Sequence, residues 1–268
     1  MKKSLAGSAA ATIGCMLAAT EVPMDLEMEF KSTSKTPWQT VLVDSGTSDW
    51  QTKWFVDGEN AQLVNTPLGW EIRTAAIPGD VNHVVVWTKQ IFEGDLRLEY
   101  DYTRLDGETQ RVNIVYLQAS GLGRLPWSTD IAQWGELRKI PAMSCYFDLM
   151  HALHVSYAAF DNSNTDPGND YVRARRYIPQ GPGRNSLKGT QIEPDDYGRT
   201  GLFVPGITYH LTFIKTGKRL FFHVSGKETN RLFAWKLDAV PPLVPGRIGF
   251  RHMYGRASRY ANIVVSTR

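Results

Sequence analysis

The chain has 268 residues, of which 42% are hydrophobic and 11% aromatic, and this composition is that of a folded globular protein and not of a disordered one. A net charge of only +3, with no run rich in Lys or Arg, argues against a nucleic-acid-binding protein. After the first twenty residues no apolar run is long enough to span a bilayer, so we expect no transmembrane segment in the mature protein.

The N-terminus has the pattern of an export signal. Lys2 and Lys3 give a positive start, and an apolar stretch of small residues follows up to Ala19. This predicts a signal peptide over residues 1–20 and an exported protein, either periplasmic or extracellular. Alternatively, the residues before Cys15 resemble a lipoprotein cleavage box, and Cys15 would then carry a lipid anchor.

The rest of the chain reads as short strands. Runs rich in β-branched and aromatic residues, separated by Gly, Pro and Asn turns, predict strands. They occupy Val41–Val43, Gly69–Ala75, Val81–Thr88, Leu96–Thr103, Arg111–Gln118, His154–Phe160, Tyr171–Tyr177, Tyr209–Ile214, Arg219–Ser225, Arg231–Lys236, Arg247–Met253 and Tyr260–Ser266.

The order of these elements predicts the fold class. One weak helical pattern, from Ala132 to Met150, interrupts the strands. A dozen strands without alternating helices favour a two-sheet antiparallel sandwich. No internal repeat or linker is visible, so residues 21–268 are expected to form a single β-sandwich domain.

Several strings in the C-terminal half resemble a known family. They are TGLFVPGITY at 200–209, RLFFHV at 219–224, GRIGFRHMY at 246–254 and ASRYAN at 257–262. Their order is similar to that in the YesU-like family of bacterial proteins, a domain of unknown function. The resemblance implies a concanavalin-A-like jelly roll. It also implies a carbohydrate context, because family members are similar to proteins encoded beside pectin- and rhamnogalacturonan-degrading enzymes.

The strand at Tyr171–Tyr177 is the first candidate site. Side chains alternate along a strand, so Tyr171, Arg173, Arg175 and Tyr177 share one face. Arginine forks bind carboxylates, and phenols stack or transfer protons. If His154 lies on the adjacent strand, the group suits β-elimination of a uronate: arginine neutralises the carboxylate, His154 or a tyrosine removes the C5 proton, and a tyrosine protonates the leaving oxygen. A solvated face with Arg–Asp pairs is the alternative.

Glu99 and Asp101 form a second candidate site. They share one strand face, as the acids of some retaining glucanases of the concanavalin-A-like fold do. A retaining glycosidase needs two carboxyl groups about 5–5.5 Å apart, whereas the Cα atoms of same-face positions on one strand are separated by about 6.6–6.8 Å. We therefore assign Glu99 and Asp101 to substrate binding, with ordinary cross-strand pairing as the alternative.

Further candidate contacts with substrate lie in the loops and near the C-terminus. Trp127 and Trp134 fall in an irregular stretch and offer apolar faces to a sugar ring, unless they anchor the loop. Arg251, His252 and Tyr254 belong to the most recognisable string of the family resemblance, which marks either a substrate contact or a corner of the fold.

The sequence offers little support for a cofactor. The loop Asp161–Asp170 is rich in oxygen ligands that suit Ca²⁺, but solvated turns have the same composition. No His/Cys cluster indicates another metal site. The sequence thus favours an exported enzyme that cleaves an acidic, uronate-containing polysaccharide or oligosaccharide by β-elimination or hydrolysis. A non-catalytic lectin-like carbohydrate-binding domain is the alternative.

Overall fold

The computed structural model describes residues 23–268. The predicted signal peptide and Cys15 lie outside this range. Among residues 23–268, no helix combines the length and the apolar character that crossing a membrane requires.

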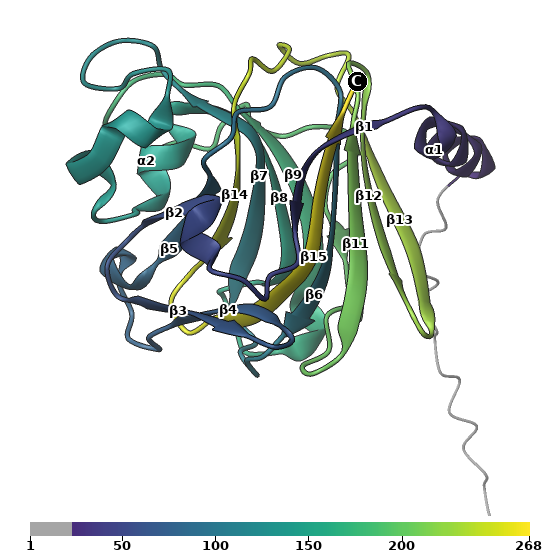
Figure 1. Ribbon diagram of the computed structural model, residues 1–268, viewed down its shortest axis with the longest axis horizontal. Helices are drawn as coiled ribbons and strands as arrows, with labels where there is room; N and C mark the ends of the chain where they lie inside the picture. The colour runs from purple at the N-terminus through teal and green to yellow at the C-terminus, as the bar shows by residue number, and fades with distance from the viewer. Residues whose placement is uncertain (1–22) are drawn as a thin grey trace, which may run out of the picture.

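Two antiparallel sheets pack face to face (Figure 1). The eight-stranded sheet has the order β13-β12-β11-β6-β15-β4-β3, and β1 also pairs with β15. These strands are β1 (Gln39–Asp44), β3 (Ala61–Thr66), β4 (Gly69–Thr74), β6 (Leu96–Arg104), β11 (Thr208–Lys215), β12 (Arg219–Gly226), β13 (Thr229–Lys236) and β15 (Ala257–Thr267).

The seven-stranded sheet has the order β10-β9-β8-β7-β14-β5-β2. Its strands are β2 (Trp54–Asp57), β5 (Val84–Thr88), β7 (Arg111–Gly121), β8 (Met150–Phe160), β9 (Asp170–Tyr177), β10 (Tyr197–Gly198) and β14 (Arg247–His252). The predicted antiparallel jelly-roll sandwich is therefore confirmed.

All twelve predicted strand segments overlap a strand of the structure. On β12, Leu220, Phe222 and Val224 enter the core between the sheets, whereas Phe221 points to the opposite side, as alternation predicts. The sequence analysis missed β2, β3 and β10, which are short or partly exposed and therefore carry a weak pattern.

Aromatic rings fill the space between the sheets. Trp70 stacks on Tyr260 with ring centroids 4.9 Å apart, and Phe250 lies 4.6 Å from the same tyrosine ring. All three side chains are fully buried. On the other side of the same sheet, Gly249 allows the Trp87 ring to pack directly against the backbone, because a Cβ at this position would overlap the ring. Burial of this apolar surface is the main source of stability.

Helical segments cover both outer faces. α1 (Met24–Lys35), which the sequence analysis did not predict, packs Phe30 against Phe221 outside β12 and β13. Near the opposite sheet, a 3₁₀ segment (Ile131–Arg138) and α2 (Met143–Phe147) replace the single helix expected over residues 132–150. α1 and α2 therefore lie on opposite sides of the molecule (Figure 1).

Candidate functional site

The outer face of the seven-stranded sheet carries the residues of the first candidate site. Tyr171 and Tyr177 of β9 pack into a hydrophobic cluster on this face, whereas Val172 and Ala174 enter the core between the sheets. β8 is the neighbouring strand, and its His154 pairs directly with Arg175. The predicted juxtaposition of His154 with the arginine strand is thus present.

His154 is not open to solvent, however. Only 4% of its surface is exposed. Its Nδ1 shares a hydrogen bond with the hydroxyl of Tyr177, and its Nε2 lies 2.6 Å from Ser156 Oγ. Burial, and secondarily the charges of nearby arginines, lower the pKa of His154 well below its usual value, so the imidazole is neutral.

The cover over this pair comes from the segment that precedes β8. The ring of Phe147 in α2 lies 6.2 Å from that of Tyr177, which is itself fully buried. Tyr146 stacks on Tyr116 of β7 at 5.6 Å. The expectation that His154 and Tyr177 flank an open groove is therefore wrong, because α2 and its neighbouring segment fill that part of the face.

An open pocket lies at the edge of the same sheet instead. It has a volume of about 480 Å³, and Tyr171 and Arg173 of β9 line it together with Asp161, Asp196 and Arg199. Arg175 does not line this pocket. Its guanidinium donates to Thr190 Oγ1 at 2.9 Å. Of the four aligned β9 residues, Tyr171 and Arg173 therefore line the open pocket together.

The guanidinium of Arg173 is already paired. It donates from Nε and Nη2 to the carboxylate of Asp196, with 2.7 Å between Nε and either oxygen. The same guanidinium lies over the ring of Tyr171, 4.3 Å from its centroid. The fork that was expected to be free for a carboxylate of the ligand is thus occupied by a carboxylate of the protein.

The charge balance of the pocket follows from its lining. Two arginines and three aspartates contribute: Arg173, Arg199, Asp161, Asp170 and Asp196. The carboxylate of Asp170 accepts backbone N–H groups from the β10–β11 loop at 2.8 and 3.0 Å, which compensates its burial. The pocket therefore has no excess of positive charge to attract an anionic sugar.

The loop at 161–169 uses its oxygens to form turns. Asp161, Asn164 and Asp166 each accept a backbone N–H two residues further on, at 2.9 Å. Within the described residues no group of three or more His, Cys, Asp or Glu side chains is placed to hold a metal ion. The suggestion of Ca²⁺ therefore gains no support from the geometry of this loop.

Glu99 and Asp101 lie on the outer face of the other sheet. They are residues of β6, and His210 of β11 sits between them, with Nδ1 2.8 Å from Asp101 and Nε2 3.6 Å from Glu99. Arg97 also donates to Glu99, at 2.7 Å. These acids therefore do not belong to the same site as Arg173, and cross-strand pairing, the alternative considered for them, describes their contacts.

We expect substitution of His210 by Gln to have a small, pH-dependent effect. Glu99 is the main cause of the raised pKa of His210, and Asp101 adds to it. The protonated form is thus favoured in the folded state, so its stabilisation is complete below the unfolded pKa of about 6.5 and is lost as the pH rises through the folded value. For this partly exposed group the difference should stay below about 1 kcal/mol. Thermal unfolding of the wild type and of His210→Gln, at pH values below about 6.5 and above the folded pKa, checks this prediction. A difference in stability of the same size at low and at high pH would contradict it.

The two tryptophans act as anchors of their loop. Trp134 is 2% exposed, and its Nε1 donates to the carbonyl of Ser128 at 2.8 Å. Trp127 packs edge-on against it, with ring centroids 4.9 Å apart. The alternative considered for both tryptophans, that they anchor the loop, therefore fits the geometry better than a sugar-binding platform does. Burial excludes Trp134 from direct contact with a ligand in this structure.

The string from Arg251 to Arg256 forms a corner of the fold. Arg251 and His252 point to opposite sides of β14, as expected, but both are fully buried. Arg251 donates to the carbonyl of Pro141 at 2.7 Å, and His252 Nε2 lies 2.9 Å from the hydroxyl of Tyr260. Neither side chain can touch a ligand in this structure, so the substrate-binding role expected for them is wrong here.

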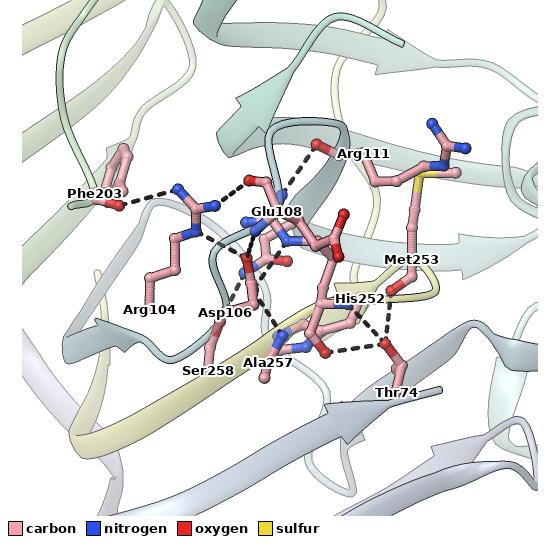
Figure 2. Close-up of polar contacts among 12 residues, drawn as sticks. Thr74, Arg104, Asp106, Glu108, Arg111, Phe203, His252, Met253, Ala257 and Ser258 are labelled. Atoms are coloured by element: carbon pink, nitrogen blue, oxygen red, sulfur yellow. Dashed lines mark hydrogen bonds and ion pairs between the residues drawn. The ribbon is translucent and has the colours of Figure 1, made fainter. Parts of the chain in front are cut away.

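The rest of this corner is held by charge pairs and stacking. Tyr254 is partly exposed and stacks on His83 at 5.6 Å, with the guanidinium of Arg111 4.5 Å from its ring centroid. Figure 2 shows Asp106 at the centre of a polar network that reaches Arg104 and the start of β15. The contacts of the string thus fit the corner of the fold that was considered as the alternative for it.

Sequence reasoning missed Asp196 and Arg199. Both stand in a region without strand periodicity, and β10 there has only two residues. The acidic run Glu193-Pro194-Asp195-Asp196 was a usable signal, because a basic strand such as β9 needs compensating charge.

Comparisons with known proteins agree on the fold. No family model matches the chain, and no curated protein matches it in sequence. A Bacillus subtilis protein of unknown function with a galectin-like fold aligns with a TM-score of 0.60 and 16% identity, over 87% of this chain and 100% of its own. The fold is that of the lectin jelly rolls.

Plant lectins align with similar coverage. Lectin II from Ulex europaeus has a TM-score of 0.54 and 10% identity, over 85% of this chain and 98% of the lectin. Basic winged bean lectin, solved with Tn-antigen, has a TM-score of 0.53 and 7% identity over the same shares of the two chains. These identities establish the fold alone, because one fold hosts many functions. Membership of the YesU-like family stays a prediction.

Proposed function

We propose that this protein is a carbohydrate-binding protein without catalytic activity, and that it binds a neutral saccharide in the pocket beside β9 and β10. The observation that carries the proposal is the Arg173–Asp196 pair, held over the Tyr171 ring at the wall of an open pocket of about 480 Å³. Pockets of this size are typical of small-molecule sites.

The pair suits neighbouring hydroxyl groups of a sugar. A hydroxyl is both a donor and an acceptor, so one hydroxyl can donate to Asp196 while the next accepts from Arg173. Because the two side chains are held against each other and against Tyr171, little side-chain freedom remains to be lost on binding. The alignment with lectins adds support from the fold, as an analogy only.

Charge favours a neutral sugar over a uronate. A ligand carboxylate would meet Asp161 and Asp196, and it could pair with Arg173 only by displacing Asp196. Placing like charges side by side opposes binding. The ligand class expected from the sequence, an acidic polysaccharide, is therefore replaced in this proposal by a neutral one.

The experiment is titration calorimetry of the protein with a panel of neutral sugars and of uronates. For the best neutral ligand, Arg173→Ala should weaken binding by about tenfold to a hundredfold, because hydrogen bonds to a charged group contribute about 1.5–3 kcal/mol. Arg175→Ala is the matched control: it lies two residues away on the same face but outside the pocket. Equal affinities of both variants and the wild type would refute the proposed site.

Asp196→Asn tests the charge argument separately. This change frees the Arg173 fork while keeping the shape of the side chain, so the preference should move toward uronates. If the wild type already binds uronates more tightly than neutral sugars, the assignment of ligand class is wrong.

Enzymatic β-elimination, the reaction expected from the sequence, would require α2 to move away, because the contact of His154 with Tyr177 is buried. The sugar panel also tests it, through the ultraviolet absorbance of the unsaturated product. Product formation that is lost in His154→Ala would favour the lyase, whose base contributes about 10²–10⁴-fold to the rate.

A further inference from the structure

Two basic side chains face each other across the core at one end of the sandwich. On β9, Arg176 continues the inward series of Val172 and Ala174. On β11 of the opposite sheet, Lys215 continues the inward series that includes Phe213. Only 1% of Arg176 and 8% of Lys215 is exposed. Inward positions of this kind are normally apolar, because a buried charge needs a partner.

Both cations line one small cavity, of about 60 Å³. Its other walls are mainly apolar and come from β8 and from the loop that follows β13, with Leu153, Leu237 and Val240 among them. None of the described residues that line the cavity is acidic. The two positive charges therefore meet in a space without a counter-charge in its walls.

Backbone carbonyls satisfy part of the donors. Arg176 donates to the carbonyls of Tyr177, Pro241 and Pro242, and Lys215 donates to that of Gly94 at 2.8 Å. Guanidinium has five N–H groups and ammonium has three, so these bonds leave two N–H groups on each side chain. Carbonyl dipoles stabilise the cations, but none of these acceptors carries a negative charge.

The pKa values also indicate that these surroundings disfavour positive charge. Burial lowers the pKa of Arg176 to about 10. Burial is also the main cause that lowers the pKa of Lys215; the charge of Asp95 opposes this lowering, and the charge of Arg176 adds to it. The folded protein thus holds two cations in surroundings that disfavour them.

We propose that the cavity between Arg176 and Lys215 binds a small monovalent anion, such as chloride, formate or acetate, which joins the two sheets at this end. A cavity of about 60 Å³ has room for a few waters or one such ion and excludes a sugar or a nucleotide. The anion would accept the remaining N–H groups of both cations. The lining residues of this site are distinct from those of the proposed saccharide pocket, so each proposal can fail without the other.

The test is thermal unfolding of the protein at neutral pH and constant ionic strength. Sodium gluconate, whose anion is too large for the cavity, is replaced stepwise by chloride, formate or acetate. An anion that binds only the folded state should raise the melting temperature by about 3 °C for each tenfold increase above its dissociation constant. The same melting temperature in gluconate and in all three small anions would overturn the proposal.

Lys215→Met separates the site from a general salt effect. Methionine keeps the length and apolar character of the stem and removes the charge, so the variant should fold and lose the dependence on small anions. Lys218→Met, at an exposed position in the turn after β11, should keep it. An anion effect of equal size in Lys215→Met and the wild type would also overturn the proposal. Arg176 is less suitable for substitution, because two of its carbonyl contacts, with Pro241 and Pro242, hold the loop after β13.

Discussion

Replacing Asp106 by Asn should lower the free energy of unfolding by about 3–5 kcal/mol, the largest single effect that we expect. Asp106 accepts from Arg104 Nε at 2.9 Å and from Arg256 Nε at 3.1 Å (Figure 2 shows the network around Asp106). It also accepts the backbone N–H of Ala257 at 2.8 Å. Both arginines are nearly or fully buried, so the amide would leave two buried cations without a counter-charge.

The electrostatics of Asp106 support the direction of this effect. Burial by itself raises the pKa of the carboxyl group, but the charges of Arg256 and Arg104 outweigh it, and the pKa is lowered. The carboxylate therefore stabilises the folded state above its unfolded pKa, and this stabilisation is lost as the pH falls through the folded value.

Urea denaturation at neutral pH measures the effect. Asp95→Asn is the matched control, because Asp95 pairs with Arg268 at 3.0 Å in a partly exposed position, where an ion pair contributes less than about 1 kcal/mol. Similar losses in the two variants would show that Asp106 does not compensate the buried arginines.

Acidification from pH 6.5 to 4.5 should also destabilise the protein strongly, before most carboxylates are protonated. His83 and His252 are almost fully buried, and burial is the main cause that lowers the pKa of each to about 3. The unfolded chain takes up these protons near pH 6.5, whereas the folded chain does not. Stability therefore falls as the pH decreases below 6.5, by about 2–3 kcal/mol for each histidine at pH 4.5. The buried imidazole of His154 acts in the same direction.

Urea denaturation across this pH range tests the prediction with His252→Gln. Glutamine has no proton to take up, so the loss of stability between pH 6.5 and 4.5 should be smaller than in the wild type by the contribution of His252, about 2–3 kcal/mol. His223→Gln, at a partly exposed position on the opposite sheet, is the control and should follow the wild type. A His252→Gln profile parallel to that of the wild type would show that His252 does not contribute to acid destabilisation.

The sequence by itself determined the class of the fold and the faces of its strands. Alternation is a local property, because successive side chains must point to opposite sides of a sheet. It therefore placed Tyr171 and Arg173 on one face, and Val172 and Ala174 on the other, before any contact was known. The same rule separated Arg251 from His252. The sequence analysis did not predict α1, because Leu26 and Phe30 are the main apolar contacts of this helix with the sheet and the rest of the helix is mostly polar.

Only the tertiary structure decided which of these faces are accessible and which charges are free. Asp196 reaches Arg173 from a loop 23 residues further along the chain, and the cover over His154 comes from the segment before β8. Glu99 and Asp101 lie on a different sheet from Arg173, although the sequence analysis had placed all three residues in contact with substrate. Ion pairing and burial depend on distances across the whole chain, and strand periodicity contains no information about them. For the same reason, the meeting of Arg176 with Lys215 across the core became visible only when the two sheets were packed together.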